Sequence, residues 1–350
     1  MPPQTSLAQE FSVRIDPHGR LLSVRPGQPV LEAALDAGLN LPHSCKSGHC
    51  GSCRAQLLAG RIAYPNGRPL GISPEEERAG GVLLCQARAL SDLSLRARLI
   101  ASVADVQIKT LPCRIDRLVP LASDVLQVWL RLPAVEQLPF QPGQYLDVLL
   151  EDGRRRSFSI ASPPHDSARL ELHVRRVAGG DFTARLFGAD PPLEAGSLLR
   201  IEGPVGQFVY RAGSGPMVLL AGGTGFAPIK SILRHVLEKG IARPVHLYWG
   251  ARTAADLYED AQVLEWMHRH AGQLSYCAVL SEGAPAAAHH RRGWVHEALF
   301  ADHPDLSAFE VYAAGPPALI EALRALGPRH GLPPERLYFD SFDYAPDSRR

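Results

Sequence analysis

The chain has 350 residues, of which 45% are hydrophobic and 21% charged, and its net charge is +1. At roughly 150 residues per domain this length predicts two or three globular domains, and the balanced charge argues against a nucleic-acid partner. No run of about 18 apolar residues occurs, so we expect no membrane span. The polar start, residues 1–10, has no apolar core of a signal peptide. We therefore expect a cytoplasmic protein with reduced cysteines.

Four of the six cysteines lie in one stretch of the sequence, between positions 45 and 85. They form a C-x4-C-x2-C pattern with a fourth cysteine 32 positions later. This spacing is typical of plant-type [2Fe–2S] ligation, in which a loop supplies three thiolates and a distant cysteine supplies the fourth. A zinc ribbon would offer two C-x2-C pairs, and only one is present. The predicted cluster ligands are Cys45, Cys50, Cys53 and Cys85.

The residues around these cysteines predict a small α+β unit. Residues 11–15 and 21–24 form an expected hairpin, residues 30–37 an expected helix, and Ser73-Pro-Glu-Glu an expected helix start with a capping box. Residues 9–100 resemble the plant-type ferredoxin (β-grasp) fold. Glycines in the cysteine loop, Gly48 and Gly51, let backbone N–H groups approach the cluster sulfurs. Cys113 and Cys277 lie outside this segment, and we read them as buried apolar residues.

The middle segment predicts a small antiparallel barrel over residues 108–210, preceded by a linker near residues 97–107. Short strand-like runs punctuated by Pro and Gly recur through it. The expected strands are residues 113–118, 125–132, 144–150, 157–161, 170–177 and 198–202, and a helix is expected over 182–187.

Two motifs in this segment carry groups that suit a flat, phosphate-bearing cofactor. The first is Arg154-Arg-Arg-Ser-Phe-Ser-Ile-Ala-Ser, and the second runs from His173 through a Gly-Gly pair to Thr183. Arginine binds phosphate, aromatic rings pack on flat cofactors, and glycines before a helix expose N–H groups to an anion. Each motif alone equally fits an arginine-rich surface strand or an ordinary helix cap.

Together the two motifs resemble the flavin-binding barrel of the ferredoxin–NADP reductase superfamily. The resemblance implies that Arg156 and Thr183, with Gly180, hold an FAD pyrophosphate. It implies that Phe158 packs on the isoalloxazine and that Ser159 bonds near flavin N5, where it has a catalytic role. Phe158 replaces the usual tyrosine, so the ring contact remains and a hydroxyl contact is lost. The residues implied to line the ring edge are His173, Val174 and Arg175.

The third segment, residues 214–345, predicts a doubly wound parallel α/β domain. An apolar strand at 217–221 enters the turn Gly222-Gly-Thr-Gly, and a helix follows to about residue 239. Such a turn alone is a weak signal for a nucleotide, but strands and helices alternate after it up to residue 326. In this alternation a helix is expected over residues 256–270. The turn residues expected to bind the nucleotide are Gly222, Gly223, Thr224 and Gly225.

Two later motifs extend the resemblance. Ala314-Gly-Pro-Pro resembles the Cys-Gly-Pro-Pro that flanks the nicotinamide, which implies roles for Gly315 and Pro316. Alanine replaces the thiol here, so hydride transfer must rest on positioning. The ending Tyr338-Phe-Asp-Ser-Phe resembles that of oxygenase reductases. By that resemblance Phe342 covers the flavin until nicotinamide displaces it, and Asp340 lies close by; the alternative is an edge strand with buried apolar residues.

The remaining histidine pairs and one arginine carry no assigned chemistry. His268, His270, His289 and His290 have no carboxylate or cysteine at metal-ligand spacing, and we read them as surface residues. Arg252 follows the second strand of the third segment, where it could meet an NADP phosphate. Arginine there suits either cofactor and does not choose between them. We expect NADH, the usual donor of the resembled family, with NADPH as the alternative.

The three resemblances follow one another along nearly the whole chain and imply an electron-transfer reductase. NAD(P)H yields two electrons as hydride, FAD releases them singly, and a [2Fe–2S] cluster passes them to a protein partner. We expect that partner to be CDP-6-deoxy-L-threo-D-glycero-4-hexulose-3-dehydrase, a deoxysugar dehydratase. One alternative is the reductase component of a multicomponent aromatic-ring or di-iron oxygenase. The second alternative is a redox sensor or binding module without turnover.

Overall fold

The computed structural model describes residues 10–39, 41–43, 46, 48, 51–97, 108–166 and 169–342. The chain divides into two compact units, residues 1–105 and 106–350. Each unit is described by itself.

The first unit is built on a mixed five-stranded sheet with the order β2-β1-β7-β3-β5. β1 pairs with β2 as an antiparallel hairpin and with β7 in parallel. Because a parallel pair requires a long crossover, β1 and β7 are far apart in sequence, and both helices and the other strands of this unit lie between them in the chain. The strands are β1 (Phe11–Asp16), β2 (Arg20–Val24), β3 (Arg54–Ala59), β4 (Ile62–Ala63), β5 (Gly81–Leu83), β6 (Arg88–Ala89) and β7 (Leu93–Arg96).

Local sequence explains the two helices of this unit. α1 (Val30–Asp36) begins after Pro29 and buries Val30, Leu31, Ala33 and Ala34 against the sheet. α2 (Pro74–Arg78) begins at Ser73, whose hydroxyl accepts from the Glu76 N–H while the Glu76 carboxylate accepts from the Ser73 N–H. This reciprocal pair is the predicted capping box, and the prediction of a β-grasp fold is confirmed.

The second unit begins with a six-stranded antiparallel sheet of order β11-β10-β13-β8-β9-β12. Ile160, which follows β11, forms a bridge with Leu172 of β12, so the two edges of the sheet meet and close a barrel. β8 is longer than expected and passes two register shifts, which bend it around the barrel. The elements are β8 (Lys109–Ala122), β9 (Val125–Arg131), β10 (Tyr145–Leu149), β11 (Arg155–Ser159), η1 (Pro164–Asp166), β12 (Arg169–Arg175), α3 (Asp181–Leu186) and β13 (Leu198–Val205).

The rest of the second unit is a parallel sheet of order β17-β16-β15-β14-β18-β19. The chain leaves β14 toward β15 on one side and returns to β18 on the other, so the strand order reverses at β14. The strands are β14 (Met217–Gly222), β15 (Val245–Ala251), β16 (Leu274–Leu280), β17 (His290–Arg292), β18 (Glu310–Gly315) and β19 (Leu337–Ser341). The helices are η2 (Gly223–Gly225), α4 (Phe226–Glu238), η3 (Ala254–Asp256), α5 (Asp260–Arg269), α6 (Val295–Asp302), α7 (Pro317–Leu326), η4 (Gly327–His330) and η5 (Pro334–Arg336).

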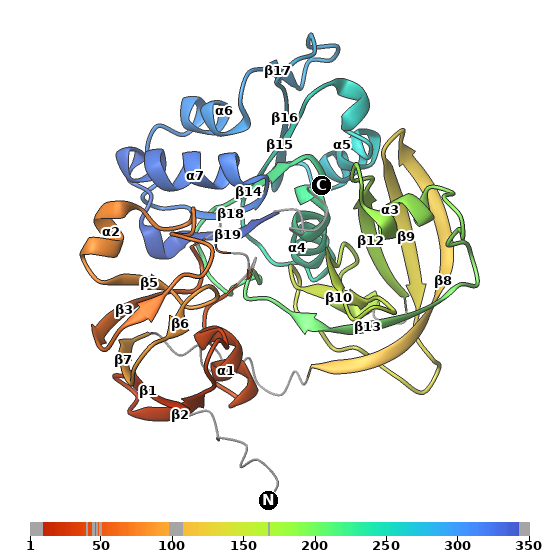
Figure 1. Cartoon of the computed structure of the whole chain (residues 1–350). Coiled ribbons are helices and arrows are strands. Elements are labelled where there is room, and N and C mark those ends of the chain that lie inside the picture. The colour runs from red at the N-terminus through yellow and green to blue at the C-terminus, as the bar shows by residue number, and fades with distance from the viewer. Residues whose placement is uncertain are drawn as a thin grey trace, which may run out of the picture. The chain divides into compact units, whose positions relative to one another are not determined.

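Alternation along β14 shows that both faces of this sheet are covered. Met217, Leu219 and Ala221 belong to the core formed with α4 and α5, whereas Val218 and Leu220 belong to the core formed with α6 and α7. Figure 1 shows the two helix layers on opposite sides of the sheet. Side chains alternate between faces in a strand, so a continuous apolar run is what a doubly covered strand requires.

The helix expected over residues 256–270 begins later in the structure. Residues 254–256 form the short η3, in which the Asp256 carboxylate accepts from the N–H and the hydroxyl of Thr253. Leu257 then leaves the helical conformation, and α5 starts at Asp260. The capping box formed by Thr253 and Asp256 therefore belongs to the short η3 and not to the start of α5.

Candidate functional site

Two of the four predicted cluster cysteines lie within the described residues and meet. Cys53 follows the loop and Cys85 follows β5, and their side chains are 3% and 5% exposed. The Cys85 N–H donates to the Cys53 Sγ at 3.5 Å, and neither thiol forms a disulfide. Two buried thiols supported by a backbone donor suit thiolate ligation of an iron–sulfur cluster. Cys45 and Cys50 lie outside the described residues.

The described parts of the cysteine loop adopt conformations that favour glycine. Gly48 and Gly51 have φ angles of +84° and +73°. A Cβ on Gly48 would lie 2.7 Å from the Gln86 side chain, and that side chain donates to the Lys46 carbonyl at 2.9 Å. The residue after Cys85 therefore contacts the described parts of this loop at Lys46 and Gly48.

The predicted flavin residues of β11 alternate as a strand requires. Arg156 and Phe158 are half-buried, whereas Arg155 and Ser157 on the opposite face are exposed. The Phe158 ring lies 5.6 Å from the ring of Phe182 in α3. One face of β11 thus carries a cation and an aromatic ring in sequence, which fits a phosphate followed by a flat ring system. Ser159 ends the strand and is buried.

The Asp181 carboxylate lies against the predicted phosphate-binding arginine. Its Oδ1 is 3.6 Å from Arg156 Nη2, and Oδ2 also pairs with Arg154. Burial would raise the pKa of Asp181, but the bond from Arg154 and the Phe182 N–H outweigh burial and lower it. The two guanidinium groups therefore hold the Asp181 carboxylate at the start of α3, beside Gly180.

The Thr183 hydroxyl has partners within its own loop. It accepts from the Val177 N–H and donates to the Gly180 carbonyl, both at 3.2 Å. Thr183 is buried, and a Cβ on Gly180 would lie 2.9 Å from its oxygen. Its position next to Gly180 agrees with the predicted pyrophosphate site, and its role there stays a prediction. In the structure the hydroxyl shapes the turn.

The glycine-rich turn and the Ala314-Gly-Pro-Pro segment meet where the strand order reverses. A Cβ on Gly225 would lie 2.1 Å from the Ala314 carbonyl oxygen, and one on Gly222 would lie 2.8 Å from Pro316 Cδ. Gly315 has a φ angle of +153°, and its Cβ would lie 3.0 Å from the Gly222 backbone. Only glycine permits this close approach. The turn and this segment therefore pack backbone against backbone at the edge where open α/β sheets bind nucleotides.

The final described strand brings two further predicted residues to the same edge. In β19, Asp340 lies opposite Ala314 and Ser341 opposite Gly315. The Phe342 N–H donates to the Gly315 carbonyl at 2.8 Å, and the Phe342 ring is partly buried. Asp340 is 6% exposed. The structure thus places Phe342 beside the predicted nicotinamide segment, and the role of Asp340 and Phe342 in turnover stays a prediction.

The barrel reaches the glycine-rich turn through Arg175. A Cβ on Gly223 would lie 3.7 Å from Arg175 Nη2, and Arg175 is held by Asp124 at 2.8 Å. From the other side the Trp249 indole N–H donates to the Gly223 carbonyl at 3.0 Å. The predicted flavin strand and the predicted nucleotide turn are therefore neighbours within one unit.

His173 belongs to a buried network of charged side chains that sequence spacing does not predict. Its Nε2 lies 3.0 Å from Glu171 Oε1, and its Nδ1 lies 3.1 Å from the Tyr258 hydroxyl. Lys230 in α4 lies 2.7 Å from Glu171 and 2.7 Å from Glu259. The one sequence signal was a lysine among the apolar residues of α4. The His173 side chain is fully buried, with its neighbour Val174 1% exposed.

One prediction about histidines is wrong. His289 and His290 are expected at the surface without a carboxylate partner, but in the structure both face Asp260 at the start of α5. Their side chains are 16% and 5% exposed. Sequence spacing could not show this contact because the partners are about 30 residues apart. His268, in contrast, is exposed.

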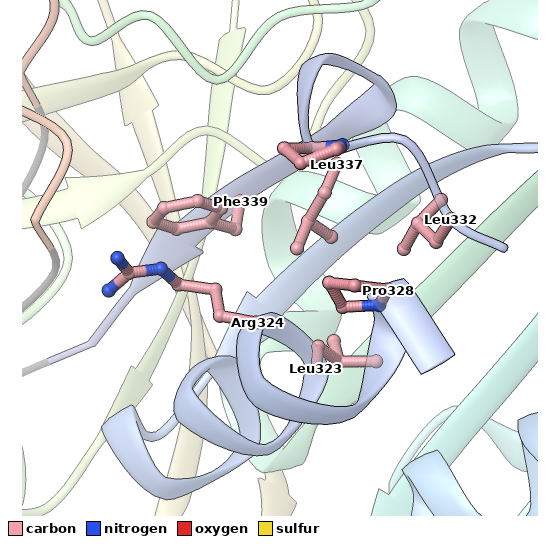
Figure 2. A pocket seen from close by; sticks show the side chains of 7 residues that line it. Leu323, Arg324, Pro328, Leu332, Leu337 and Phe339 are labelled. Carbon is pink, nitrogen blue, oxygen red and sulfur yellow. The ribbon is translucent and has the colours of Figure 1, made fainter. Parts of the chain in front are cut away.

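A separate hollow lies between α7, η4, η5 and β19 (Figure 2). Arg324 lies over the Phe339 ring at 5.9 Å there. The remaining lining side chains are apolar, so the hollow offers no cluster of polar groups for a nucleotide. Its lining residues are Leu323, Arg324, Pro328, Leu332, Pro334, Leu337 and Phe339.

Comparison with known proteins agrees with this geometry along the whole chain. Residues 13–90 match the 2Fe-2S iron-sulfur cluster binding domain, residues 112–210 the oxidoreductase FAD-binding domain, and residues 219–325 the oxidoreductase NAD-binding domain. The fold and the matched domains define an NAD(P)H-dependent oxidoreductase that carries FAD and a [2Fe–2S] cluster. The chain belongs to the family of ferredoxin-fused reductases within the ferredoxin–NADP reductase superfamily.

Three relatives illustrate the range of this family. The chain is 37% identical over 332 residues to the CDP-6-deoxy-L-threo-D-glycero-4-hexulose-3-dehydrase reductase of Yersinia pestis, covering 95% of this chain and 98% of the relative. It is 36% identical over 324 residues to reductase component 1 of terephthalate 1,2-dioxygenase from Comamonas, covering 92% and 94%. The crystal structure of an Amycolatopsis cytochrome P450 reductase superposes with a TM-score of 0.76 at 35% identity, covering 95% and 98%. The predicted fold, cofactors and electron-transfer activity are confirmed.

None of the described helices is both long enough and apolar enough to cross a membrane.

Proposed function

We propose that this chain passes electrons from NADH to a CDP-6-deoxyhexulose 3-dehydrase in the cytoplasm. The observation that carries the electron-transfer part is the meeting of three predicted elements in one unit. The Ala314-Gly-Pro-Pro segment meets the glycine-rich turn at Gly222 and Gly225, and Arg175 of β12 meets it at Gly223. The dehydrase is supported by the Yersinia pestis relative, whose name specifies that partner.

NAD(P)H supplies a hydride, FAD converts it into single electrons, and the [2Fe–2S] cluster carries one electron at a time. The residues of the chain bind and orient these groups. In this proposal Arg156 neutralises the FAD pyrophosphate near Gly180 and Thr183, and Phe158 packs on the flavin ring. Ser159 donates a hydrogen bond at the ring edge lined by His173, Val174 and Arg175.

In this proposal the glycine-rich turn and the Ala314-Gly-Pro-Pro segment hold the nicotinamide cofactor. Gly222, Gly223, Thr224 and Gly225 receive its pyrophosphate, while Gly315 and Pro316 flank the nicotinamide. Ala314 is fully buried and carries no thiol, so these residues act by positioning and by excluding water. In this proposal Phe342 covers the flavin in the absence of nicotinamide, which the bond from its N–H to the Gly315 carbonyl supports.

The cluster is held by Cys45, Cys50, Cys53 and Cys85 in this proposal. We assign residues 9–100 to the ferredoxin domain, residues 108–210 to the FAD-binding domain and residues 214–345 to the NAD(P)H-binding domain. Donation to an oxygenase is the second candidate, because the Comamonas relative is nearly as similar as the Yersinia one. Both candidates use the same chemistry in this chain and differ in the acceptor.

An anaerobic titration with NADH tests the electron-transfer proposal. FAD and one cluster accept about three electrons per chain, whereas uptake of two shows that the cluster is absent or disconnected. Acceptor identity is tested separately by NADH oxidation in the presence of the purified dehydrase or a purified aromatic-ring oxygenase. Stimulation by the oxygenase alone would refute the dehydrase assignment. A higher kcat/KM with NADPH would refute the cofactor preference.

A further inference from the structure

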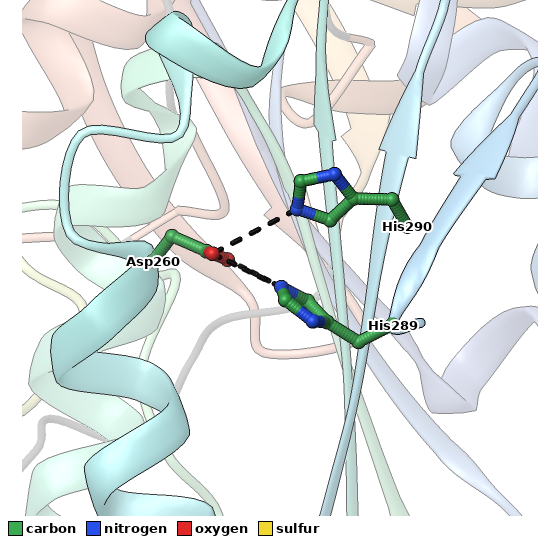
Figure 3. A group of neighbouring side chains, drawn as sticks. All are labelled: Asp260, His289 and His290. Carbon is green, nitrogen blue, oxygen red and sulfur yellow. Dashed lines mark hydrogen bonds and ion pairs between the residues drawn. The ribbon is translucent and has the colours of Figure 1, made fainter. Parts of the chain in front are cut away.

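Three side chains from two elements converge at the edge of the parallel sheet. Asp260 begins α5, His290 begins β17, the edge strand paired with β16, and His289 directly precedes that strand. Figure 3 shows both imidazole rings directed at the same carboxylate. Their ligand-type atoms all lie within 4.8 Å of one another.

The separations match those between ligands of one metal ion. Asp260 Oδ2 is 3.0 Å from His289 Nε2 and 3.7 Å from His290 Nε2. Zinc binds imidazole nitrogen and carboxylate oxygen at about 2.0–2.2 Å, so two ligands of a tetrahedral ion lie about 3.4 Å apart. The observed values lie on either side of this figure, and shifts of a few tenths of an ångström would complete the site.

One nitrogen in this group is buried without a partner. His290 Nε2 forms no hydrogen bond, and its side chain is 5% exposed. At 3.7 Å from Asp260 the pair is too long for a hydrogen bond. A buried polar atom left unsatisfied costs free energy, so its position facing a carboxylate and a second imidazole points to a missing cation.

The surrounding contacts support the carboxylate rather than replace the cation. The Tyr276 hydroxyl donates to Asp260 Oδ1 at 2.7 Å. Within the described part of the chain, no lysine or arginine pairs with Asp260. A hydrogen bond like that from the Tyr276 hydroxyl commonly orients a carboxylate that ligates a metal ion.

A second group of possible ligands in the same unit provides the contrast. Glu171, His173 and Glu259 also lie close enough to share an ion. There the Lys230 ammonium sits 2.7 Å from both carboxylates and supplies the positive charge itself. That group is a completed ion network, whereas the group at Asp260 has ligands and no built-in cation.

We propose that Asp260, His289 and His290 form a binding site for one divalent transition-metal ion, with Zn²⁺ as the ion. Two imidazoles and one carboxylate are a ligand set that favours zinc over Mg²⁺ or Ca²⁺. Side-chain exposures of 25% for Asp260 and 16% for His289 leave a route from solvent. The bound ion links the edge strand β17 to the start of α5.

Binding also requires a defined change of tautomer. The Ala286 N–H donates to His290 Nδ1 at 3.3 Å, which places the imidazole proton on Nε2 in the free site. A neutral imidazole that ligates through Nε2 carries its proton on Nδ1, so the bond from Ala286 is released when zinc binds. The Nε2 protons of both rings, including the one that His289 shares with Asp260 at 3.0 Å, pass to water when zinc binds, and water returns one proton to Nδ1 of each ring, so no net proton is released.

Zinc titration of the holoprotein tests the proposal. Calorimetry with ZnCl₂ is combined with zinc and iron analysis of the dialysed product and with a zinc-edge X-ray absorption spectrum. We expect about one zinc per chain, unchanged iron, and nitrogen and oxygen ligands without sulfur. Sulfur in the spectrum or loss of iron would mean that zinc binds at the cluster cysteines, which would overturn the proposal.

Single substitutions identify the ligands. His289→Asn, His290→Asn and Asp260→Asn should each weaken zinc binding by at least about 10-fold. His268→Asn, on the exposed face of α5, is the matched control and should leave it unchanged. FAD content and the thermal transition report whether each variant is folded. If His290→Asn, at the buried position, does not fold, His289→Asn still tests the site. Absence of saturable uptake, or uptake equal in folded ligand variants and wild type, would refute the site.

Discussion

Lys230 Nζ lies 2.7 Å from Glu171 Oε1, so helix α4 of the nucleotide-binding part is tied to strand β12 of the barrel by a buried ion pair. Lys230 and Glu171 are 5% and 1% exposed. A second buried bond, from the Ser231 hydroxyl to the Ser162 carbonyl at 2.8 Å, joins the same two parts. These contacts hold the predicted flavin strand next to the predicted nucleotide turn.

Replacing Lys230 with methionine should destabilise the second unit. The substitution keeps the length of the side chain but leaves Glu171 and Glu259 buried without their shared cation. Breaking a buried pair in this way costs about 3–5 kcal/mol. The loss of unfolding free energy is measured by urea unfolding monitored through the rise in fluorescence of released flavin. The exposed Lys239→Met is the control. Equal stability of Lys230→Met and wild type would show that the network is energetically neutral.

The same network predicts a dependence of stability on acid pH. Burial would raise the pKa of Glu171, but the His173 hydrogen bond and the Lys230 charge outweigh it and hold the pKa well below its usual 4.5. A depressed pKa stabilises the folded state above the unfolded pKa, and that stability is lost as the pH falls through the folded value.

Wild type should therefore lose more unfolding free energy than Glu171→Gln as the pH falls below about 4.5, by up to about 1.4 kcal/mol per pH unit. Urea unfolding at several pH values compares the two slopes, and Glu151→Gln at an exposed site is the control. Parallel curves for wild type and Glu171→Gln would contradict the assignment of the shift to Glu171.

Cluster content should separate the cysteines into two groups. Cys53→Ser and Cys85→Ser should lose the cluster, with iron falling from about two per chain toward zero. Cys113→Ser should keep it, because burial raises the pKa of the Cys113 thiol to about 12 and no thiolate is available at neutral pH. Iron analysis and visible absorption are the measurements. Full iron content in Cys85→Ser would remove Cys85 from the ligand set.

Gly225→Ala should weaken NADH binding while FAD is retained. The added Cβ would meet the Ala314 carbonyl at 2.1 Å, so the turn must move away from the Ala314-Gly-Pro-Pro segment. We expect the KM for NADH to rise about 10-fold or more, which corresponds to about 1.4 kcal/mol. Steady-state kinetics with a one-electron dye measure it. Gly272→Ala is the control for a strained glycine away from the turn, because its Cβ meets nothing within 4 Å but its φ is +83°. It should lower stability and leave the KM for NADH unchanged.

Arg156→Ala should release FAD, and Arg155→Ala should not. The two arginines are adjacent in β11 but lie on opposite faces, and Arg155 pairs with Glu202 and Asp147 instead. Loss of one charge-assisted contact to phosphate should weaken FAD binding by about 10-fold or more. The dissociation constant of FAD, measured by fluorescence quenching, tests this. Equal losses in both variants would indicate a general electrostatic effect.

The sequence by itself determined the parts of this protein that depend on local spacing. The cysteine pattern, the capping box at Ser73 and the glycine-rich turn after an apolar strand each predict a local structure, because ligation, capping and tight turns need certain residues at short separations. The alternation of strands and helices likewise predicted the parallel sheet, since its period is a property of neighbouring residues.

Only the tertiary structure decided which distant polar side chains meet. Lys230 reaches Glu171 across 59 positions, and His289 reaches Asp260 across 29, with no spacing rule that connects either pair. The helix expected over residues 256–270 starts only at Asp260, because Asp256 closes η3 before α5. Such outcomes depend on how whole elements pack, because packing is what buries a charge, removes its water and so makes its partner necessary.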